Sequence, residues 1–499
     1  MKTSDTLLGL DLGTSHLKAC LFERDSGRPV VCAGSRLPVR LLENGGREQD
    51  VDAILRILKR MVRKLQQSSS GGWRHVLGVG VASQGGSSII VSPDGAPLTP
   101  MMLWNDARAH AMNARVLEVR PARFWRKLTL RDVPPHGMAR ILWLRRNRSE
   151  LFSGSGGKVM HAGAGDYLFF ALTGIWRQDA GSAIQIGPYD AQRQCLDERP
   201  LKALDLALDF VPPLREGHTT CPLSVSGAAL LNLPAGTPVA GPYIDQEAGY
   251  RSAAVAVDAP LQVSLGTAWV GNFQIAEAQS GESPYQLVLP ADVPGQRLVV
   301  LPLLTGNATW EWAVREFAGG DGAKALAKAN AVLKRRPFPH AGLYQLPWNT
   351  QENPLIPGAH GGGMFIGMNA NTSRDDLLSA TAACLAFELG RVFAQLRDSG
   401  VIKNVVLTGG ASNSEHFRRL IAALMSPLPV WQANGDLAGS HGALHAFGCT
   451  LQRTALERVP LPGAEFQREA WACFAEYQEL LHKLYGHVKA GRPYTLAHA

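Results

Sequence analysis

The sequence of 499 residues has no cysteine pair at C-x-x-C spacing, and its seven cysteines are scattered from position 20 to position 473. An odd number of such cysteines in a long chain argues against a disulfide framework or a zinc site, and favours reduced thiols. The sequence also lacks an uninterrupted apolar run of about 18 residues, and its first ten residues lack the apolar region of a signal peptide. We therefore expect a cytoplasmic protein with no membrane partner.

A strong charge of either sign is also missing. Lysine and arginine number 50 against 42 aspartate and glutamate residues, and the net charge of +8 is spread along the chain. Aromatic residues make up only 7%, and no basic stripe is interleaved with them, which excludes a nucleic-acid partner. The hydrophobic content of 45% indicates a globular protein, and the length favours two large domains.

A short turn at residues 11–15 (Asp-Leu-Gly-Thr-Ser) joins two apolar runs and predicts a β-hairpin. It lacks the Gly-Lys-Ser/Thr ending of a P-loop. The turn nevertheless offers backbone N–H groups and polar side chains suited to phosphate, and a carboxylate able to hold Mg²⁺ through water. These side chains belong to Asp11, Thr14, Ser15 and Lys18. A plain hairpin without a ligand is the alternative for this stretch.

A second turn of the same kind occurs at residues 261–270, where Gly266 and Thr267 separate two more apolar runs. The echo suggests two related domains, each presenting a Gly-Thr hairpin to phosphate. Further along, an apolar strand at residues 405–408 is followed by Gly409 and Gly410, and then by a helix that begins near residue 415. Bare backbone before a helix N-terminus suits a nucleotide, although a double glycine after a strand is often only a turn.

Polar residues also follow predicted strands elsewhere. Gln84 and Gly85 end a strand at residues 76–82, and Asp245 ends one that begins at residue 239. The segment at residues 104–108 (Trp-Asn-Asp-Ala-Arg) is compatible with the wall of a binding site or with a helix start capped by its aspartate. His441 and His445 have helical spacing but no third ligand nearby, so we interpret them as structural.

The ordered series of motifs resembles the FGGY family of carbohydrate kinases, and it is most like the xylulokinase branch. The resemblance runs from residue 6 to residue 450. The motifs that carry it are residues 11–15 with Lys18, residues 48–50, Gln84, residues 104–108, 166–167 and 172–174, Asp245, residues 264–267 and residues 408–410.

The resemblance implies an α/β fold of two actin-like ATPase (ribonuclease-H-like) domains, which close around a central cleft over ATP and sugar. It implies a first domain at residues 1–245 with the sugar site and a second at residues 246–499 with the nucleotide site, and a homodimer. The implied roles are as follows: Asp245 is the catalytic base and, with Asp11, a magnesium ligand; Thr14, Ser15, Lys18, Gly266 and Thr267 bind phosphate; Gly410 and Ser414 bind adenosine; Gln84, Gly85, Trp104, Asp106 and Asp245 bind the sugar.

The sequence departs from the family at the expected sugar site. Gly85 and Gly86 follow Gln84 where xylulokinase-like members have Met-His, and the Arg-Glu pair of glycerol kinases is missing. The first departure predicts a larger pocket. We expect an ATP-dependent kinase with D-xylulose as the leading acceptor and with another pentulose, a polyol or a sugar acid as alternatives. A non-catalytic sugar- or nucleotide-binding protein is a further alternative, which the presence of both Asp11 and Asp245 disfavours.

Overall fold

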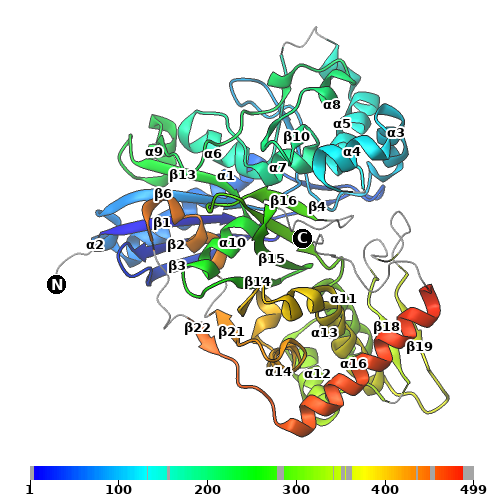
Figure 1. Ribbon diagram of the computed structural model, residues 1–499. Helices are drawn as coiled ribbons and strands as arrows, with labels where there is room; N and C mark the ends of the chain where they lie inside the picture. Colours follow the sequence, from blue (N-terminus) through cyan, green and yellow to red (C-terminus); the bar gives the residue numbers. More distant parts are fainter. Residues whose placement is uncertain are drawn as a thin grey trace. The chain divides into compact units, whose positions relative to one another are not determined.

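The computed structural model describes residues 5–131, 133–153, 158–277, 286–340, 342–349, 355, 362–433, 437–449 and 456–486. The chain divides into two compact units, which are described separately (Figure 1). The first unit contains residues Met1–Ala256, Leu287–Pro290 and Leu437–Arg453, and the second contains the remainder. The first unit therefore includes a late segment of the chain, in addition to the residues that precede the boundary expected at 245.

A six-stranded sheet in the order β12-β13-β6-β1-β2-β3 forms the centre of the first unit. Its strands are β1 (Thr6–Leu12), β2 (His16–Glu23), β3 (Pro29–Arg36), β6 (Val76–Ser83), β12 (Cys221–Pro222) and β13 (Pro238–Ile244). β1 and β2 form the predicted hairpin, with Asp11 opposite Lys18. β6 runs parallel to both β1 and β13, so the carboxyl ends of these three strands lie at one edge of the sheet.

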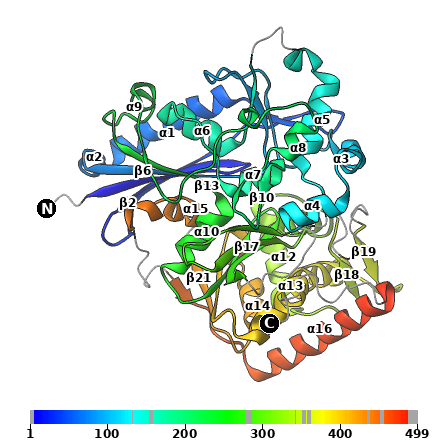
Figure 2. The same ribbon diagram turned by 45° about the horizontal axis from the view of Figure 1, so that its top comes forward.

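Helices cover both faces of this sheet (Figures 1 and 2). On one face lie α1 (Val51–Ser68), α6 (Ala164–Thr173) and α9 (Val225–Leu231), whose apolar sides pack against strand residues in one core. The Asp50 carboxylate caps α1 by accepting a hydrogen bond from the backbone N–H of Asp52. α6 ends at Gly174, which adopts a left-handed conformation with φ of 73°.

The other face of the sheet is covered by α10 (Asp245–Ala254) and α15 (Ala438–Gly442), and α15 belongs to the late segment of the chain. Small residues let α15 approach closely: a Cβ atom on Gly439 would lie 2.5 Å from Oδ2 of Asp11. His441 of α15 is buried, with its ring nitrogens 3.1 Å from the Ser252 hydroxyl and 3.7 Å from the Cys449 thiol. Burial lowers the pKa of His441 to about 4, in keeping with its expected structural role.

The rest of the first unit consists of short elements, some of which form a second core that contains Trp125, Met138 and Ile141. The helices are α2 (Ser70–Trp73), α3 (Asn113–Val119), α4 (Ala122–Thr129), α5 (His136–Asn147), α7 (Ala180–Ile186) and α8 (Arg199–Lys202). The strands are β4 (Arg40–Leu41), β5 (Arg47–Gln49), β7 (Ile89–Val91), β8 (Met101–Met102), β9 (Met160–Ala162), β10 (Tyr189–Asp190), β11 (Cys195–Leu196) and β16 (Leu287–Pro290).

One expectation about the cysteines is wrong. Cys20 and Cys32 form a disulfide, while Cys195, Cys221 and three other cysteines are free. The two bridged residues stand directly opposite each other in the antiparallel pair β2–β3, with their Cα atoms 4.1 Å apart. The strand pairing brings them together, and the spacing in the sequence carries no sign of it.

The second unit is built on a sheet whose strands follow the order β17-β15-β14-β20-β21-β22. They are β14 (Pro260–Leu265), β15 (Trp269–Ala276), β17 (Gln296–Pro302), β20 (Asn404–Thr408), β21 (Val430–Ala433) and β22 (Leu456–Arg458), with the small pair β18 (Tyr344–Leu346) and β19 (Met364–Ile366) beside them. β14 and β15 form the second predicted hairpin. The helices are α11 (Asn307–Ala313), α12 (Ala323–Arg335), α13 (Arg374–Ser399), α14 (Glu415–Met425) and α16 (Ala464–Tyr485).

The long helix α13 is central to the second unit. Among the described residues it is the one helix whose length and apolar composition would allow it to cross a membrane, and 89% of its apolar window is buried inside the protein. Phe387 and Phe393 are fully buried in the core between α13 and its neighbours. α16, drawn in red along the outside of this unit in Figure 1, packs against α13 and α14. α13 is therefore accounted for as a core helix.

Candidate functional site

Three polar residues gather where the parallel strands of the first unit end. Asp11 is near the end of β1, Gln84 directly follows β6, and Asp245 directly follows β13. The strands are in register at this edge, because Leu12 pairs with Ser83 and the N–H of Gln84 donates a 2.8 Å hydrogen bond to the carbonyl of Leu12. The carboxyl edge of a parallel sheet is the common position of ligand sites in α/β proteins.

Asp245 is the first residue of α10. The local sequence alone would have placed it in a turn. The pKa of its carboxyl is raised to about 8, chiefly by burial and then by the negative charges of Asp11 and Asp179, against the hydrogen bond from the N–H of Gln246. A carboxyl group with a pKa near neutrality is a stronger base than an ordinary carboxylate, which is a feature of catalytic acids and bases.

Asp179 was not singled out in the sequence, although it caps α7 near the same site. Its carboxylate accepts 2.8 Å hydrogen bonds from the N–H and the hydroxyl of Ser182. Burial, and then the charge of Glu247, raises the pKa of Asp179. Glu247 is itself held by Arg215 and Arg251, each with an Nη2–Oε1 distance of 2.8 Å. Asp11 on β1 and Asp179 at the start of α7 thus place negative charge near Asp245, and the two arginines pair with Glu247.

The Thr14 hydroxyl connects the β1–β2 turn to the expected sugar residues. It donates to Oε1 of Gln84 at 2.8 Å and accepts from the indole N–H of Trp104 at 2.9 Å. The Gln49 amide donates to the Thr14 carbonyl at 2.8 Å. Gln84 is 3% exposed, and its Nε2 is buried without a hydrogen-bond partner among the described residues. A buried amide N–H₂ without a partner is costly, and is a mark of a position that a ligand completes.

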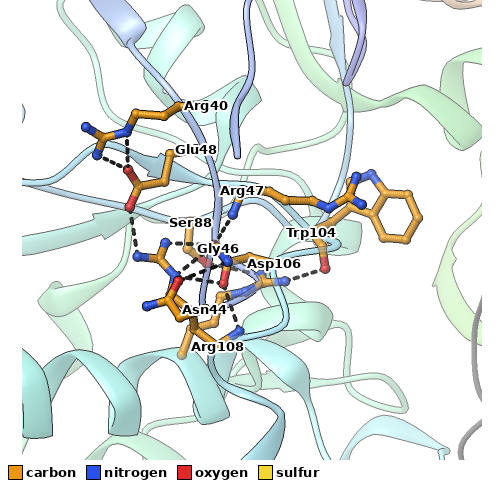
Figure 3. Close-up of polar contacts among 10 residues, drawn as sticks. Arg40, Asn44, Gly46, Arg47, Glu48, Ser88, Trp104, Asp106 and Arg108 are labelled. Carbon is orange, nitrogen blue, oxygen red and sulfur yellow. Dashed lines mark hydrogen bonds and ion pairs between the residues drawn. The ribbon is translucent and has the colours of Figure 1, made fainter. Parts of the chain in front are cut away.

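Asp106 lies in a buried network of ion pairs. Arg108 donates to its carboxylate through Nη2 at 2.7 Å and also contacts Glu48 at 2.8 Å, and Arg40 completes the series (Figure 3). The backbone N–H of Arg47 donates to Oδ2 of Asp106 at 2.8 Å. Burial raises the pKa of Asp106, but the hydrogen bonds from Arg108 and the backbone outweigh it and leave that pKa below its usual value.

We therefore expect the substitution Asp106→Asn to reduce the stability of the protein and to change the binding of the acceptor only indirectly. It removes the charge that holds Arg108 and costs about 1–3 kcal/mol of unfolding free energy. Thermal unfolding of the variant measures this loss. A variant that melts like the parent and has a raised KM for the acceptor would instead favour the role in sugar binding that the resemblance implies.

Arg140 forms hydrogen bonds with the backbone close to Gln84. Its guanidinium donates to the carbonyl of Trp104 at 2.6 Å, to the carbonyl of Gly86, and to the Ser88 hydroxyl at 3.4 Å. Arg140 is 3% exposed, and burial lowers the pKa of its guanidinium to about 10, so the side chain remains charged at neutral pH. Figure 3 shows Trp104 and Ser88 from the two segments that Arg140 joins. These segments are thereby fixed relative to each other.

In the second unit, the Gly266–Thr267 turn is braced by the start of α11. The backbone N–H of Asn307 donates to the Gly266 carbonyl at 3.2 Å, and that of Ala308 donates to the Thr267 carbonyl at 3.1 Å. The Asn307 side chain links the carbonyl of Leu265, at 3.0 Å, to the indole N–H of Trp269, at 2.9 Å. Both strands of the hairpin are therefore held on either side of the turn.

The predicted strand, double glycine and helix are also present in this unit. Gly409 has φ of 83°, and a Cβ atom there would lie 2.8 Å from the backbone carbon of Leu265, so only glycine fits. Gly410 is exposed and begins a short 3₁₀ helix. Ser414 is the N-cap residue of α14, and its hydroxyl does not cap the helix. The exposed backbone and hydroxyl suit an adenosine group.

The fold and the arrangement of these motifs define a class. Residues 6–250 match the N-terminal domain of the FGGY family of carbohydrate kinases, and residues 262–448 match its C-terminal domain. The chain therefore belongs to this family, as the motif order indicated, and is an ATP-dependent carbohydrate kinase. The expected two-domain α/β fold is confirmed.

Curated relatives match along nearly the whole chain. It is 24% identical to the xylulose kinase of Escherichia coli strain K12 over 497 residues, covering 96% of this chain and 98% of the relative. It is 25% identical to the L-xylulose/3-keto-L-gulonate kinase of the same organism, covering 98% and 99% of the two chains.

Solved structures share the fold. The xylulose kinase from Rhodospirillum rubrum superposes with a TM-score of 0.79 at 20% identity, covering 96% of this chain and 99% of that one. The gluconate kinase from Lactobacillus acidophilus gives 0.81 at 19% identity, with 97% and 99% covered. Because kinases with different acceptors fit almost equally well, the fold does not select the acceptor.

Proposed function

We propose that this kinase transfers the γ-phosphate of ATP to a hydroxyl of a ketose, with D-xylulose, converted to D-xylulose 5-phosphate, as the leading acceptor. The observation that carries the proposal is the position of Asp245 at the end of β13, next to Asp11 and Asp179, with a pKa raised to about 8. The xylulose kinases among its relatives support the choice of acceptor. We also propose a cytoplasmic location, in line with the metabolic role of these relatives, and a homodimer, which light scattering would test.

In the proposed reaction, a carboxylate oxygen of Asp245 accepts the proton of the attacking sugar hydroxyl. As the proton leaves, the hydroxyl oxygen forms a bond to the γ-phosphorus, and the bond from that phosphorus to the bridging oxygen of ADP breaks. We assign the binding of phosphate to the turn with Thr14, Ser15 and Lys18 and to the turn with Gly266 and Thr267. The N–H groups of such turns suit phosphate oxygens.

Asp11 and Asp245 form a set of oxygen donors that fits Mg²⁺, which favours one or two carboxylates together with water and phosphate. The effect of the Asp11 charge on the pKa of Asp245 supports this fit, because two like charges held near each other favour a cation. Bound Mg²⁺ would neutralise charge on the transferred phosphoryl group. We assign the binding of adenosine to Gly410 and Ser414, and that of the sugar to Gln84, Gly85 and Trp104.

The test is ADP release with Mg-ATP and a panel of D-xylulose, L-xylulose, D-ribulose, erythritol, glycerol and gluconate. We expect saturable turnover with D-xylulose, at a kcat/KM about 10-fold or more above the other acceptors. Preference for another ketose, erythritol or gluconate would support the alternative acceptors. Bound ATP without turnover of any acceptor would contradict the kinase assignment and favour a binding protein.

A further inference from the structure

The two glycines that distinguish this chain from xylulokinase-like sequences face a glutamine side chain from another element. A Cβ atom on Gly85 would lie 2.5 Å from Nε2 of Gln185 and in closer contact with Cδ1 of Ile244. A Cβ atom on Gly86 would overlap Oε1 of Gln185 and lie 3.3 Å from Cβ of Trp104. The amide of Gln185 thus occupies part of the space that side chains at positions 85 and 86 would take.

Gln185 is held in this position by its helix. α7 begins at Asp179, whose carboxylate caps it through Ser182. The helix also packs tightly against α5, since a Cβ atom on Gly137 would lie 2.5 Å from Cα of Ile186. Ile186, the next residue, is 3% exposed. The backbone that carries the Gln185 side chain is therefore fixed.

The surroundings of the Gln185 amide are those of the candidate sugar site. It lies over the two residues that follow Gln84, and Ile244, which precedes Asp245, contacts the same space. Gln185 is half-buried, and its amide forms no hydrogen bond with the described residues. The buried Nε2 of Gln84 also lacks a partner among them. Two amides from separate segments thus lie close to the end of β13, which Asp245 follows.

We propose that Gln185 is a specificity-determining residue of this kinase, which binds a hydroxyl of the acceptor sugar through its side-chain amide. The proposal rests on the proposed function. Gly85 and Gly86 and the glutamine form a matched set, because side chains at 85 and 86 would exclude the amide. An amide both donates and accepts hydrogen bonds, so it recognises a hydroxyl of a neutral polyhydroxy compound.

The first test compares the parent protein with Gln185→Ala, with Gln67→Ala on the exposed side of α1 as the matched control. We expect the KM for the preferred acceptor to rise about 10- to 100-fold in Gln185→Ala, with the KM for ATP unchanged. Deoxy analogues of that acceptor identify the hydroxyl. The analogue that lacks the hydroxyl bound by Gln185 should have a higher KM than the full acceptor in the parent protein, but a similar KM in Gln185→Ala. An acceptor KM within about twofold of the parent value would overturn the proposal.

The second test reads the packing without any reaction. Gly85→Ala should lower the thermal unfolding temperature, and part of that loss should disappear in Gly85→Ala/Gln185→Ala, because the clash with the amide is removed. Additive losses would overturn the matched set. If the parent turns over no acceptor at all, the proposed function fails and this inference with it; turnover that does not depend on Gln185 defeats the inference alone.

Discussion

The substitution Asp245→Asn is expected to remove phosphoryl transfer while the folded protein is retained. Asparagine has nearly the same shape as aspartate, but its amide cannot accept the proton of the attacking hydroxyl. We expect kcat to fall by about 10²- to 10⁴-fold, the contribution of a general base. ADP release with the preferred acceptor measures the loss. A variant with the turnover of the parent would show that another group accepts the proton.

The same substitution should stabilise the ligand-free protein above pH 4. The pKa of Asp245 in the folded state is about 8, against an ordinary value of 3.8 for aspartate, so at intermediate pH the unfolded chain releases this proton and the folded chain keeps it. The stability of the parent therefore falls as the pH rises from about 4 to about 8, and Asp245→Asn escapes this loss. Since each unit of pKa shift corresponds to about 1.4 kcal/mol, we expect a gain of several kcal/mol at pH 8 that disappears near pH 4.

The control for both measurements is Asp258→Asn. Asp258 is exposed on the second unit, in a surface ion pair with Lys403. Exposed pairs of this kind contribute little to stability. The control should have the turnover and the pH dependence of unfolding of the parent. If both variants changed stability equally across pH, the effect would come from net charge and not from the buried position of Asp245.

The largest expected loss of stability follows from replacing Glu388 with alanine. Glu388 is fully buried in α13 and accepts hydrogen bonds from three side chains: Arg391 at 2.7 and 2.8 Å, Tyr477 at 2.9 Å and Trp348 at 3.2 Å. Tyr477 lies on α16, so this carboxylate also fixes the last helix to the core. Its removal would leave the charge of Arg391 buried without the carboxylate that it pairs with.

We expect Glu388→Ala to lose about 3–5 kcal/mol of unfolding free energy, as for other broken buried pairs. For a unit of this size, the unfolding temperature should fall by about 10 °C, which calorimetry would measure. The double variant Glu388→Met/Arg391→Met should recover much of the loss, because it leaves no buried charge. Glu316→Ala, in an exposed pair with Arg315, should have almost no effect. A loss of similar size in both single variants would contradict this account.

The elements that the sequence predicted are those with a local signal. The two Gly-Thr hairpins, and the strand at residues 405–408 with its double glycine and following helix, each combine an apolar run with a turn signal, and these elements are confirmed. The identity of these elements depends on neighbours within a few residues. Patterns of this kind survive folding because tertiary contacts reinforce them.

The features that sequence reasoning missed depend on contacts between distant segments. Gln185 lies at the candidate site only because α7 packs over Gly85 and Gly86, which stand a hundred residues earlier in the chain. The capping aspartate at the start of that helix, Asp179, was a detectable signal, but nothing local placed it near Asp245. Likewise, Cys20 is joined to Cys32 because β2 pairs with β3, and no rule about cysteine spacing would have found this bond.

The late segment that carries α15 has a consequence for synthesis of the chain. The first unit includes the segment that starts at Leu437, so α15 cannot cover its part of the sheet until that late segment has been synthesised. Until then, the backbone of Gly9 lacks its close contact with Ser440, and that of Gly80 lacks its close contact with Ala443. A truncation after Ala256 would leave this face of the sheet with α10 but without α15, whereas a circular permutant that begins with α15 would supply both helices.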